Sequence, residues 1–353
     1  MSTRSANVVG LGLIGGSVAA GLTSRGWRVR GVDAADGIVA EAVARGVIEA
    51  GGLDPASDVS IVAVPVSAIP GTAARLLTET TGAVTDLGSV KGAVVREVAS
   101  PRFVGGHPMA GSELHGLAGA DPGLFQGAMW VLTPTPSTDD RAFQSVASLV
   151  RDLGAEPIVL DAEVHDRLVA IVSHLPHLTA GALMRVAVRR ADDHGAVLRL
   201  AAGGFRDMTR VASGHPDIWI DICRENRSAI LDSIDELVAA LQETRRFVED
   251  GDDVRLRDAL QAAREARSNL PGRIRELRDA VEVRVPIPDR AGAAAEIFAI
   301  AAETGVNVAN FEVVHSTEGD RGVLVMVVEA VQRELFRGGL LARGYRPTVS
   351  SLA

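Results

Sequence analysis

The sequence predicts an α/β protein in three parts: a Rossmann-type doubly wound sheet domain, an all-helical domain and a ferredoxin-like βαββαβ domain. Short apolar strands alternate with helical segments up to about residue 162, which is typical of a parallel sheet covered by helices. Strand signals are almost absent from residue 164 to about residue 280, and they return after it. We therefore place the three domains at residues 1–162, 163–279 and 280–353.

Composition and charge narrow the class of protein. The 353 residues exceed one typical core, and an apolar fraction of 47% argues against disorder. A net charge of -9 gives no basic footprint for nucleic acid, and the apolar run near the N-terminus is too short and too rich in glycine to span a membrane. The single cysteine, Cys223, excludes an internal disulfide and suits a reducing compartment. We expect a cytoplasmic protein with no nucleic-acid or membrane partner.

Apolar runs and turn residues predict the elements of the first domain. A strand at residues 6–12 enters a glycine turn, and the helix that follows at residues 15–26 is closed by Gly26. Further strands are expected at residues 27–33, 58–65, 82–89, 102–108, 127–134 and 155–161. The stretch GGHPMAGSELHG at residues 105–116 holds Gly and Pro, which makes regular structure there improbable. We interpret it as a loop that carries reactive groups.

The other two domains follow from helical and strand periodicity. In the middle domain Ile230, Ile234, Leu237 and Leu241 share one helical face, which is either a dimer interface or buried core. A charged helical segment then breaks at Pro271-Gly272. In the last domain, strands at 280–288, 306–316, 322–330 and 345–352 and helices at 289–305 and 332–344 give the order βαββαβ.

Three glycines between the first strand and its helix predict a dinucleotide site. Gly10, Gly12 and Gly15 form G-x-G-x-x-G, which permits a tight turn and close approach of a pyrophosphate to the helix N-terminus. Asp33 ends the second strand, where an acid accepts from a ribose 2′-hydroxyl and repels a 2′-phosphate, so we favour NAD over NADP. The alternative is a glycine turn without a ligand. The expected cofactor-binding residues are Gly10, Gly12, Leu13, Ile14, Gly15, Asp33, Val64 and Ser89.

Four further segments concentrate polar side chains. They are DLGSVKG with Ser89 and Lys91, GGHPMAGSELHG with His107, Ser112, Glu113 and His115, SHLPH with His174 and His177 at a helix-breaking Pro176, and GGFRDMTR with Arg206, Asp207 and Arg210. Oxidation of an alcohol requires a base, which a histidine supplies near neutral pH, and an arginine suits a carboxylate.

Other interpretations of these polar residues stay open. A metal held by His174, His177 and His107 lacks the usual carboxylate or cysteine company, so we predict no metal. Arg206 is equally well a surface charge, and Asp207 could orient Arg210. We interpret the remaining histidines as structural: His115, His165, His194, His215 and His315.

The motifs GLGLIGGS, DLGSVK, GGHPMAGSE, SHLPH and GGFRDMTR occur in the order found in the prephenate dehydrogenase family, which this chain resembles over roughly residues 7–280. The resemblance implies NAD-dependent oxidative decarboxylation of prephenate to 4-hydroxyphenylpyruvate in tyrosine biosynthesis, and a homodimer formed through the helical domain. It implies that His107 is the catalytic base, that Ser89 bonds near the substrate hydroxyl, and that Arg210 binds a substrate carboxylate. The other substrate-site residues that it implies are His177, Glu113 and Trp219. From the residues themselves we add Ser112 to the substrate site, with Asp207 and His174 in support.

The last 74 residues resemble an ACT domain, which implies a regulatory site for an amino acid such as tyrosine. The usual DRPG of that module reads DRAG at residues 289–292, so its ligand site is either altered or lost. Arogenate, alone or with prephenate as in a cyclohexadienyl dehydrogenase, is the alternative substrate, and Glu113 could favour its ammonium group. More distant alternatives are a 3-hydroxy-acid dehydrogenase and a non-catalytic NAD-sensing regulator.

Overall fold

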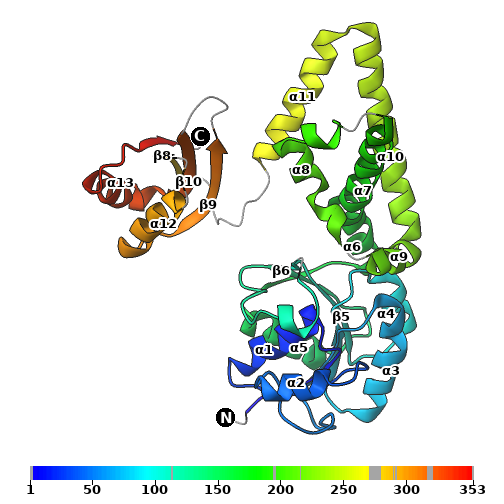
Figure 1. Cartoon of the computed structure of the whole chain (residues 1–353). Coiled ribbons are helices and arrows are strands. Elements are labelled where there is room, and N and C mark those ends of the chain that lie inside the picture. The colour runs from blue at the N-terminus through cyan, green and yellow to red at the C-terminus, as the bar shows by residue number, and fades with distance from the viewer. Residues whose placement is uncertain are drawn as a thin grey trace. The chain divides into compact units, whose positions relative to one another are not determined.

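The computed structural model describes residues 3–112, 114–193, 196–214, 216–269, 280–288, 290, 292–315 and 321–351. These residues form two compact units, Met1–Glu249 and Asp250–Ala353 (Figure 1). Several residues singled out in the sequence lie outside the described ranges: Glu113, His194, His215, Pro271, Gly272 and Asp289.

A seven-stranded sheet in the order β2-β1-β3-β4-β5-β6-β7 forms the centre of the first unit, as far as the described residues go. Its strands are β1 (Ser5–Val9), β2 (Arg28–Val32), β3 (Val59–Val62), β4 (Ala83–Asp86), β5 (Phe103–Pro108), β6 (Met129–Thr133) and β7 (Glu156–Val159). All neighbours pair in parallel except β5 and β6, which are antiparallel. The predicted Rossmann-like α/β domain is confirmed, with one antiparallel pairing that strand patterns alone do not reveal.

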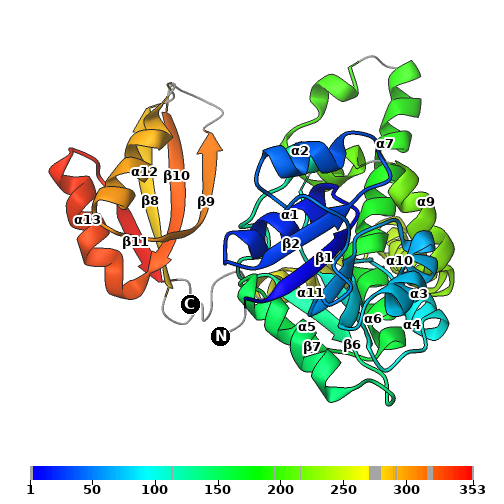
Figure 2. The ribbon, with the colours of Figure 1, turned by 90° about the horizontal axis from the view of Figure 1, so that it is seen from below.

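Helices cover both faces of this sheet, as the predicted doubly wound arrangement requires (Figures 1 and 2). Helices α1 (Leu13–Thr23), α2 (Ile38–Ala44) and α5 (Asp140–Asp152) share a hydrophobic core on one face. Helices α3 (Ile69–Glu79) and α4 (Gly92–Glu97) build the core of the other face. Because helices cover both faces of the sheet, β3 and β4 are buried along their whole length.

The GGHP residues belong to β5, which runs to Pro108 as the strand predicted at residues 102–108 requires, so only the rest of the GGHPMAGSELHG stretch lies beyond the strand. A Cβ atom at Gly105 would collide with the Thr133 hydroxyl, and one at Gly106 would lie 2.7 Å from the carbonyl oxygen of Asp86. The glycines therefore let β5 pass close to its neighbours rather than turn. His107 consequently lies on a strand, opposite Val131 of β6, and not on a mobile loop.

The second part of the first unit is helical, as predicted. It contains α6 (Ala162–Val169), a π-helical turn (Ala170–His174), α7 (Leu175–Asp193), α8 (Gly203–Thr209), α9 (Pro216–Glu225) and α10 (Arg227–Asp250).

Across the described residues of both units, short 3-10 turns occur at Val66–Ala68, Leu117–Gly119, Leu198–Leu200, Arg210–Ser213 and Ala330–Gln332.

Pro176 does not break the helix, which corrects the prediction. The chain stays helical from α6 through the π-helical turn into α7. A proline lacks the N–H donor and crowds the carbonyl group four residues earlier, and a widened π-helical turn before it relieves that conflict. The turn carries His174, and His177 follows in the first turn of α7.

The apolar stripe of α10 is buried only where the helix begins. Ile230 is buried against the core of α3 and α4, and Ile234 packs on the same core. Leu241, on the same face, is 59% exposed. The stripe thus continues beyond the core that covers its start.

The second unit begins with α11 (Asp253–Ser268) and contains an antiparallel four-stranded sheet in the order β11-β8-β10-β9, counted over its described residues. The elements after α11 are β8 (Ala280–Pro288), α12 (Ala293–Glu303), β9 (Val308–His315), β10 (Arg321–Glu329), α13 (Arg333–Ala342) and β11 (Thr348–Ser351). Alternate residues of β8 are buried, and α12 and α13 supply Ile297 and Phe336 to the same core (Figure 2). The strands and helices fall close to the predicted ranges.

Among the described helices, none is both long enough and apolar enough to span a membrane.

The close passage of β5 makes Gly106→Ala strongly destabilising. The added Cβ would lie 2.7 Å from a carbonyl oxygen and 2.9 Å from the Thr85 hydroxyl, both buried, so we expect a loss of about 1–3 kcal/mol in the free energy of unfolding. Gly71→Ala is the matched control, because nothing lies within 4 Å of its Cβ position on α3 and alanine favours a helix. Denaturant unfolding that ranks the two variants equally would contradict this account of β5.

Candidate active site

The glycine turn after β1 has three glycines with different surroundings. Gly10 has a φ of +95°, and a Cβ there would collide with the carbonyl oxygen of Ala63. A Cβ on Gly15 would collide with the carbonyl oxygen of Gly10, so Gly15 allows α1 to pack on the turn. At Gly12, in contrast, nothing lies within 4 Å of the Cβ position. The first and third glycines therefore serve the fold, and the second leaves open space for a group outside the protein.

The N-terminus of α1 is free to bind an anion. Gly12 is its N-cap residue, no side chain caps the helix, and no acid lies in its first turn. The first N–H groups of a helix lack intrahelical acceptors and carry partial positive charge. The backbone of Leu13, Ile14 and Gly15 thus suits phosphate oxygens that approach over Gly12.

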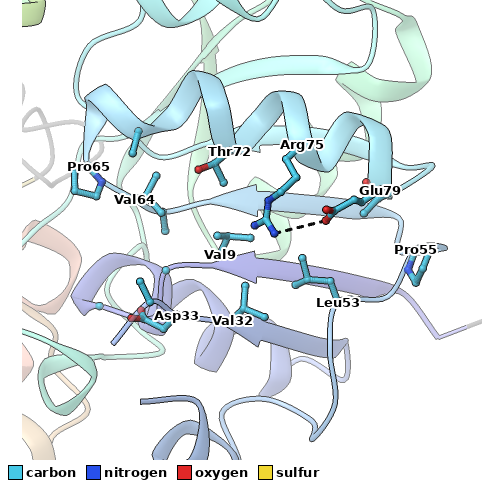
Figure 3. A pocket seen from close by; sticks show the side chains of 16 residues that line it. Val9, Val32, Asp33, Leu53, Pro55, Val64, Pro65, Thr72, Arg75 and Glu79 are labelled. Carbon is cyan, nitrogen blue, oxygen red and sulfur yellow. Dashed lines mark ion pairs between the residues drawn. The ribbon is translucent and has the colours of Figure 1, made fainter. Parts of the chain in front are cut away.

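A cavity of about 1100 Å³ adjoins this turn at the carboxyl ends of β1, β2 and β3 (Figure 3). Its walls include predicted cofactor residues, namely Gly10, Gly12, Asp33 and Val64. They also include residues that the sequence analysis missed: Leu53 and Pro55 from a loop, and Thr72, Arg75 and Glu79 from α3. Nothing in their spacing marks these residues, because only the fold brings α3 and the loop to the same cavity.

The Asp33 carboxylate also makes hydrogen bonds within the protein. Its Oδ2 accepts from the N–H of Leu11 at 2.6 Å, and its Oδ1 accepts from the N–H of Ala35 at 2.8 Å. The carboxylate thereby fixes the glycine turn against the end of β2. Each oxygen keeps a second lone pair, so the group can still accept from a hydroxyl in the cavity.

His107 is held by a chain of buried polar groups. Its Nδ1 lies 2.8 Å from Nε2 of His165, and Nδ1 of His165 lies 2.8 Å from Oδ1 of Asp166. The Asp166 carboxylate accepts from the backbone N–H groups of Lys91 and Gly92, at 2.8 Å and 2.7 Å. This chain, His107–His165–Asp166, joins the end of β5 to the start of α6 and to the turn before α4.

A buried ion pair supports the same strand end. Lys91 Nζ pairs with Oδ2 of Asp86, and both side chains are fully buried. The other carboxylate oxygen, Oδ1, accepts from the N–H of Gly106 at 3.1 Å, next to His107. Asp86 therefore holds the backbone on which His107 lies, while His165 holds its ring.

These surroundings keep the His107 ring neutral. Burial lowers the pKa of His107 well below 6.5, and the neighbouring His165 and Lys91 lower the pKa further. Burial also lowers the pKa of Lys91, against the opposing effect of Asp86. The neutral ring is favoured chiefly because a charged ring would be buried away from water, and the nearby Lys91 cation adds to this effect.

His174, His177 and Trp219 form a second group in the helical part. His177 stacks on Trp219, with ring centroids 3.5 Å apart, and His174 meets Trp219 edge-on at 6.1 Å. Asn226 Nδ2 lies 3.2 Å from Nδ1 of His174 and 2.8 Å from the carbonyl oxygen of Asp166, which links this group to the His107 chain. Burial lowers the pKa of His174 to about 4.

His174 can present a donor. Because Asn226 donates to Nδ1, the neutral ring carries its proton on Nε2. That Nε2 is buried and has no hydrogen-bond partner among the described residues. A buried donor without a partner is costly in a stable fold and is often satisfied by a ligand.

The structure does not bring all the predicted site residues together. Ser89 follows β4 in the turn that carries Lys91, and within the described ranges no hydrogen bond joins it to His107. Ser112 Oγ accepts from the N–H of Leu114 at 3.2 Å, which is loop geometry. Arg210 follows α8 as the first residue of the 3-10 turn Arg210–Ser213, and Asp207 lies within α8.

His165 and Asp166 are the most informative residues to which the sequence analysis gave no part in the site. His165 was interpreted as structural, and Asp166 was not considered. Both lie in the first turns of α6, where a His-Asp pair carries no recognisable motif. Their contact with His107 depends on the packing of α6 over the end of β5, which spacing along the chain does not encode.

No group of three or more His, Cys, Asp or Glu side chains with metal-binding geometry occurs among the described residues. The imidazole nitrogens of His107 and His165 face each other and not a common centre. The arrangement instead suits a reaction that needs a neutral base beside a bound nucleotide.

The chain matches two family sequence models. The nucleotide-binding domain of prephenate dehydrogenase matches residues 18–159, and the dimerization domain of prephenate dehydrogenase matches residues 161–262.

Relatives of known name agree with these matches. The chain is 35% identical over 340 residues to a prephenate dehydrogenase of Bacillus subtilis, which covers 90% of each chain. It is similar to the structure of prephenate dehydrogenase from A. aeolicus in complex with hydroxyphenyl propionate and NAD+, with 29% identity, a TM-score of 0.72 and coverage of 77% of this chain and 99% of that one. It is also similar to the structure of Synechocystis arogenate dehydrogenase, with 30% identity and a TM-score of 0.68. That similarity covers 76% of this chain and 100% of the other.

Proposed function

Because the chain belongs to the prephenate dehydrogenase family and is an NAD-dependent dehydrogenase, we propose that it catalyses the oxidative decarboxylation of prephenate to 4-hydroxyphenylpyruvate. The observation that carries the proposal is His107 at the end of β5. Its ring is neutral, is anchored through Nδ1 and leaves Nε2 for a substrate.

The residues around the glycine turn fit NAD. The open space at Gly12 and the uncapped N-terminus of α1 suit the pyrophosphate, and Asp33 suits the adenosine ribose. The cavity lined by Val64, Leu53 and Arg75 is large enough for the adenosine part. NAD held there would supply the hydride acceptor for the ring carbon that bears the substrate hydroxyl.

His107 acts on the hydroxyl proton. Its Nε2 takes that proton as the hydride leaves the same carbon, so a ketone forms opposite the ring carboxylate. Loss of carbon dioxide then leaves its bonding electrons in the ring, which becomes a phenolate. His107 can return the proton to this oxygen, so that prephenate and NAD give 4-hydroxyphenylpyruvate, carbon dioxide and NADH with no net proton.

The remaining site residues orient the substrate. We assign a substrate carboxylate to Arg210, the wall of the pocket to the stacked His177 and Trp219, and a hydrogen bond near the hydroxyl to Ser89. The unpartnered Nε2–H of His174 supplies a further donor. Glu113 belongs to the proposal through the family resemblance and lies outside the described residues, and Ser112 and Asp207 are kept from the sequence analysis.

Two further parts of the proposal concern assembly and regulation. A homodimer through the helical part is supported by the match to a dimerization domain and by the exposed apolar side chains there, including Ile218, Ile220 and Leu241. Tyrosine binding at an ACT-like module in residues 280–353 is supported by the order of strands and helices in that segment.

Because the Cβ position of Gly12 is open, we expect a substitution there to weaken NAD binding without lowering the stability of the protein. Gly12→Ala should leave the melting temperature within a few degrees of the wild type, because its Cβ meets no protein atom. The same Cβ would occupy the space assigned to the pyrophosphate, so we expect the Kd for NAD to rise at least tenfold in calorimetry. Unchanged NAD affinity in a folded Gly12→Ala protein would remove the pyrophosphate from this turn.

The reaction itself is tested by NADH formation with prephenate, and with arogenate in parallel, each with NAD and NADP. We expect NADH with prephenate, and we expect His107→Asn to lower kcat by about 10²–10⁴-fold because the proton acceptor is lost. Its Kd for NAD should stay near that of the wild type, since His107 does not line the cavity at the glycine turn.

Preferred turnover of arogenate would transfer the proposal to that substrate. No turnover of either substrate by the wild type would end it, and a near-normal kcat in His107→Asn would exclude His107 as the base.

A further inference from the structure

We propose that His165 and Asp166 are positioning residues that fix the tautomer of His107, so that Nε2 is the nitrogen that takes the substrate proton. The inference deepens the proposed function and rests on it, because it concerns the same base. It assigns a role to a histidine and an aspartate that show no sequence motif and do not line the cavity at the glycine turn.

The first step concerns the orientation of Asp166. Its Oδ1 accepts from the N–H of Lys91 and its Oδ2 accepts from the N–H of Gly92. Both donors are backbone groups of a turn that the buried Lys91 side chain anchors to Asp86. Asp166 is only 6% exposed, so these bonds fix its carboxylate with an acceptor oxygen toward His165.

The second step shows how the oriented Asp166 carboxylate places the proton on His165. An acceptor at Oδ1 requires that Nδ1 of His165 carries the proton, because the two atoms are 2.8 Å apart. An imidazole with its proton on Nδ1 has its lone pair on Nε2, and Nε2 of His165 faces His107. His165 is fully buried, so no solvent molecule competes for either nitrogen.

The third step shows how the His165 ring places the proton on His107. A lone pair on Nε2 of His165 requires a proton on Nδ1 of His107, again at 2.8 Å. The two rings meet nearly edge-on, with an interplanar angle of 77°, and the bond from Nδ1 orients the His107 ring. Neutral His107 therefore has its lone pair on Nε2, and the imidazolium formed by proton uptake keeps its Nδ1–H bond toward the Asp166 side.

If His165 and Asp166 had only a structural role, the expected effect of substituting them would differ. Three polar side chains that only fill space would contribute to stability and leave kcat of a folded variant near that of the wild type. The charged and titratable groups that face the His107–His165 pair are Lys91 and Asp86 from the turn after β4, Asp166 from α6 and His174 from the π-helical turn. Substitutions at His165 leave these four groups in place.

The test compares His165→Leu with His165→Gln in the full-length protein. Leucine removes the acceptor for Nδ1 of His107, whereas the carbonyl oxygen of glutamine can accept from it. We expect His165→Leu to lower kcat at least tenfold, with KM and the Kd for NAD little changed, and to move the acid limb of the pH profile of kcat/KM. We expect His165→Gln to recover a substantial part of kcat. Melting temperatures of both variants identify any loss that is due to unfolding.

A kcat for folded His165→Leu within twofold of the wild type would overturn the proposal while leaving the dehydrogenase intact. Equal losses in both variants, in proportion to their melting temperatures, would also overturn it, since they indicate a structural role.

A measurement that needs no catalytic turnover tests the role of His165 independently of the proposed function. In ¹⁵N NMR of the wild type near neutral pH, His107 should show a protonated Nδ1 and an unprotonated Nε2, and His165→Leu should show a mixture of tautomers. If the wild type turns over neither prephenate nor arogenate, the proposed function fails, and this tautomer assignment alone decides the positioning role. The opposite tautomer in the wild type would reject that role.

Discussion

The buried carboxylate of Asp166 is the group on which the arrangement of the candidate active site depends. It accepts from two backbone N–H groups and from one imidazole, and these three donors come from the turn before α4 and from α6 itself. Loss of the carboxylate would leave buried donors unsatisfied, at roughly 1–3 kcal/mol each. The same bonds that stabilise the packing of α6 on the sheet also orient His165 and, through it, His107.

The ion pair of Lys91 and Asp86 couples this carboxylate to the strand that carries the base. Breaking a buried pair by removing one partner is strongly destabilising, by about 3–5 kcal/mol, because an uncompensated charge stays behind. Here the pair also holds the N–H of Gly106 and anchors the turn that binds Asp166. The base is thus fixed through its backbone by Asp86 and through its ring by His165. Burial, with the Lys91 cation nearby, lowers the pKa of His107, so the ring is unprotonated at neutral pH and its lone pair is available.

Much of the fold and part of the site could be predicted from the sequence. The strand ranges, the glycine turn, Asp33 and His107 are encoded locally, by apolar runs and by residues whose backbone or side-chain chemistry is specific. The π-helical turn before Pro176 and the close passage of β5 along its neighbours at Gly105 and Gly106 were not predicted, because both depend on neighbours that only the folded chain supplies. His165, Asp166 and the α3 wall of the cavity escaped for the same reason: their roles arise from packing between elements far apart in the sequence.

The central claim is that a buried polar chain presents Nε2 of His107 to the substrate. The most direct measurement is a crystal structure of this protein with NAD and hydroxyphenyl propionate, the ligands seen together in the A. aeolicus structure. The account predicts that Nε2 of His107 lies within about 3.2 Å of the phenol oxygen while Nδ1 keeps its bond to His165. A His107 ring that turns Nδ1 toward the phenol, or that leaves His165 to reach it, would contradict the account.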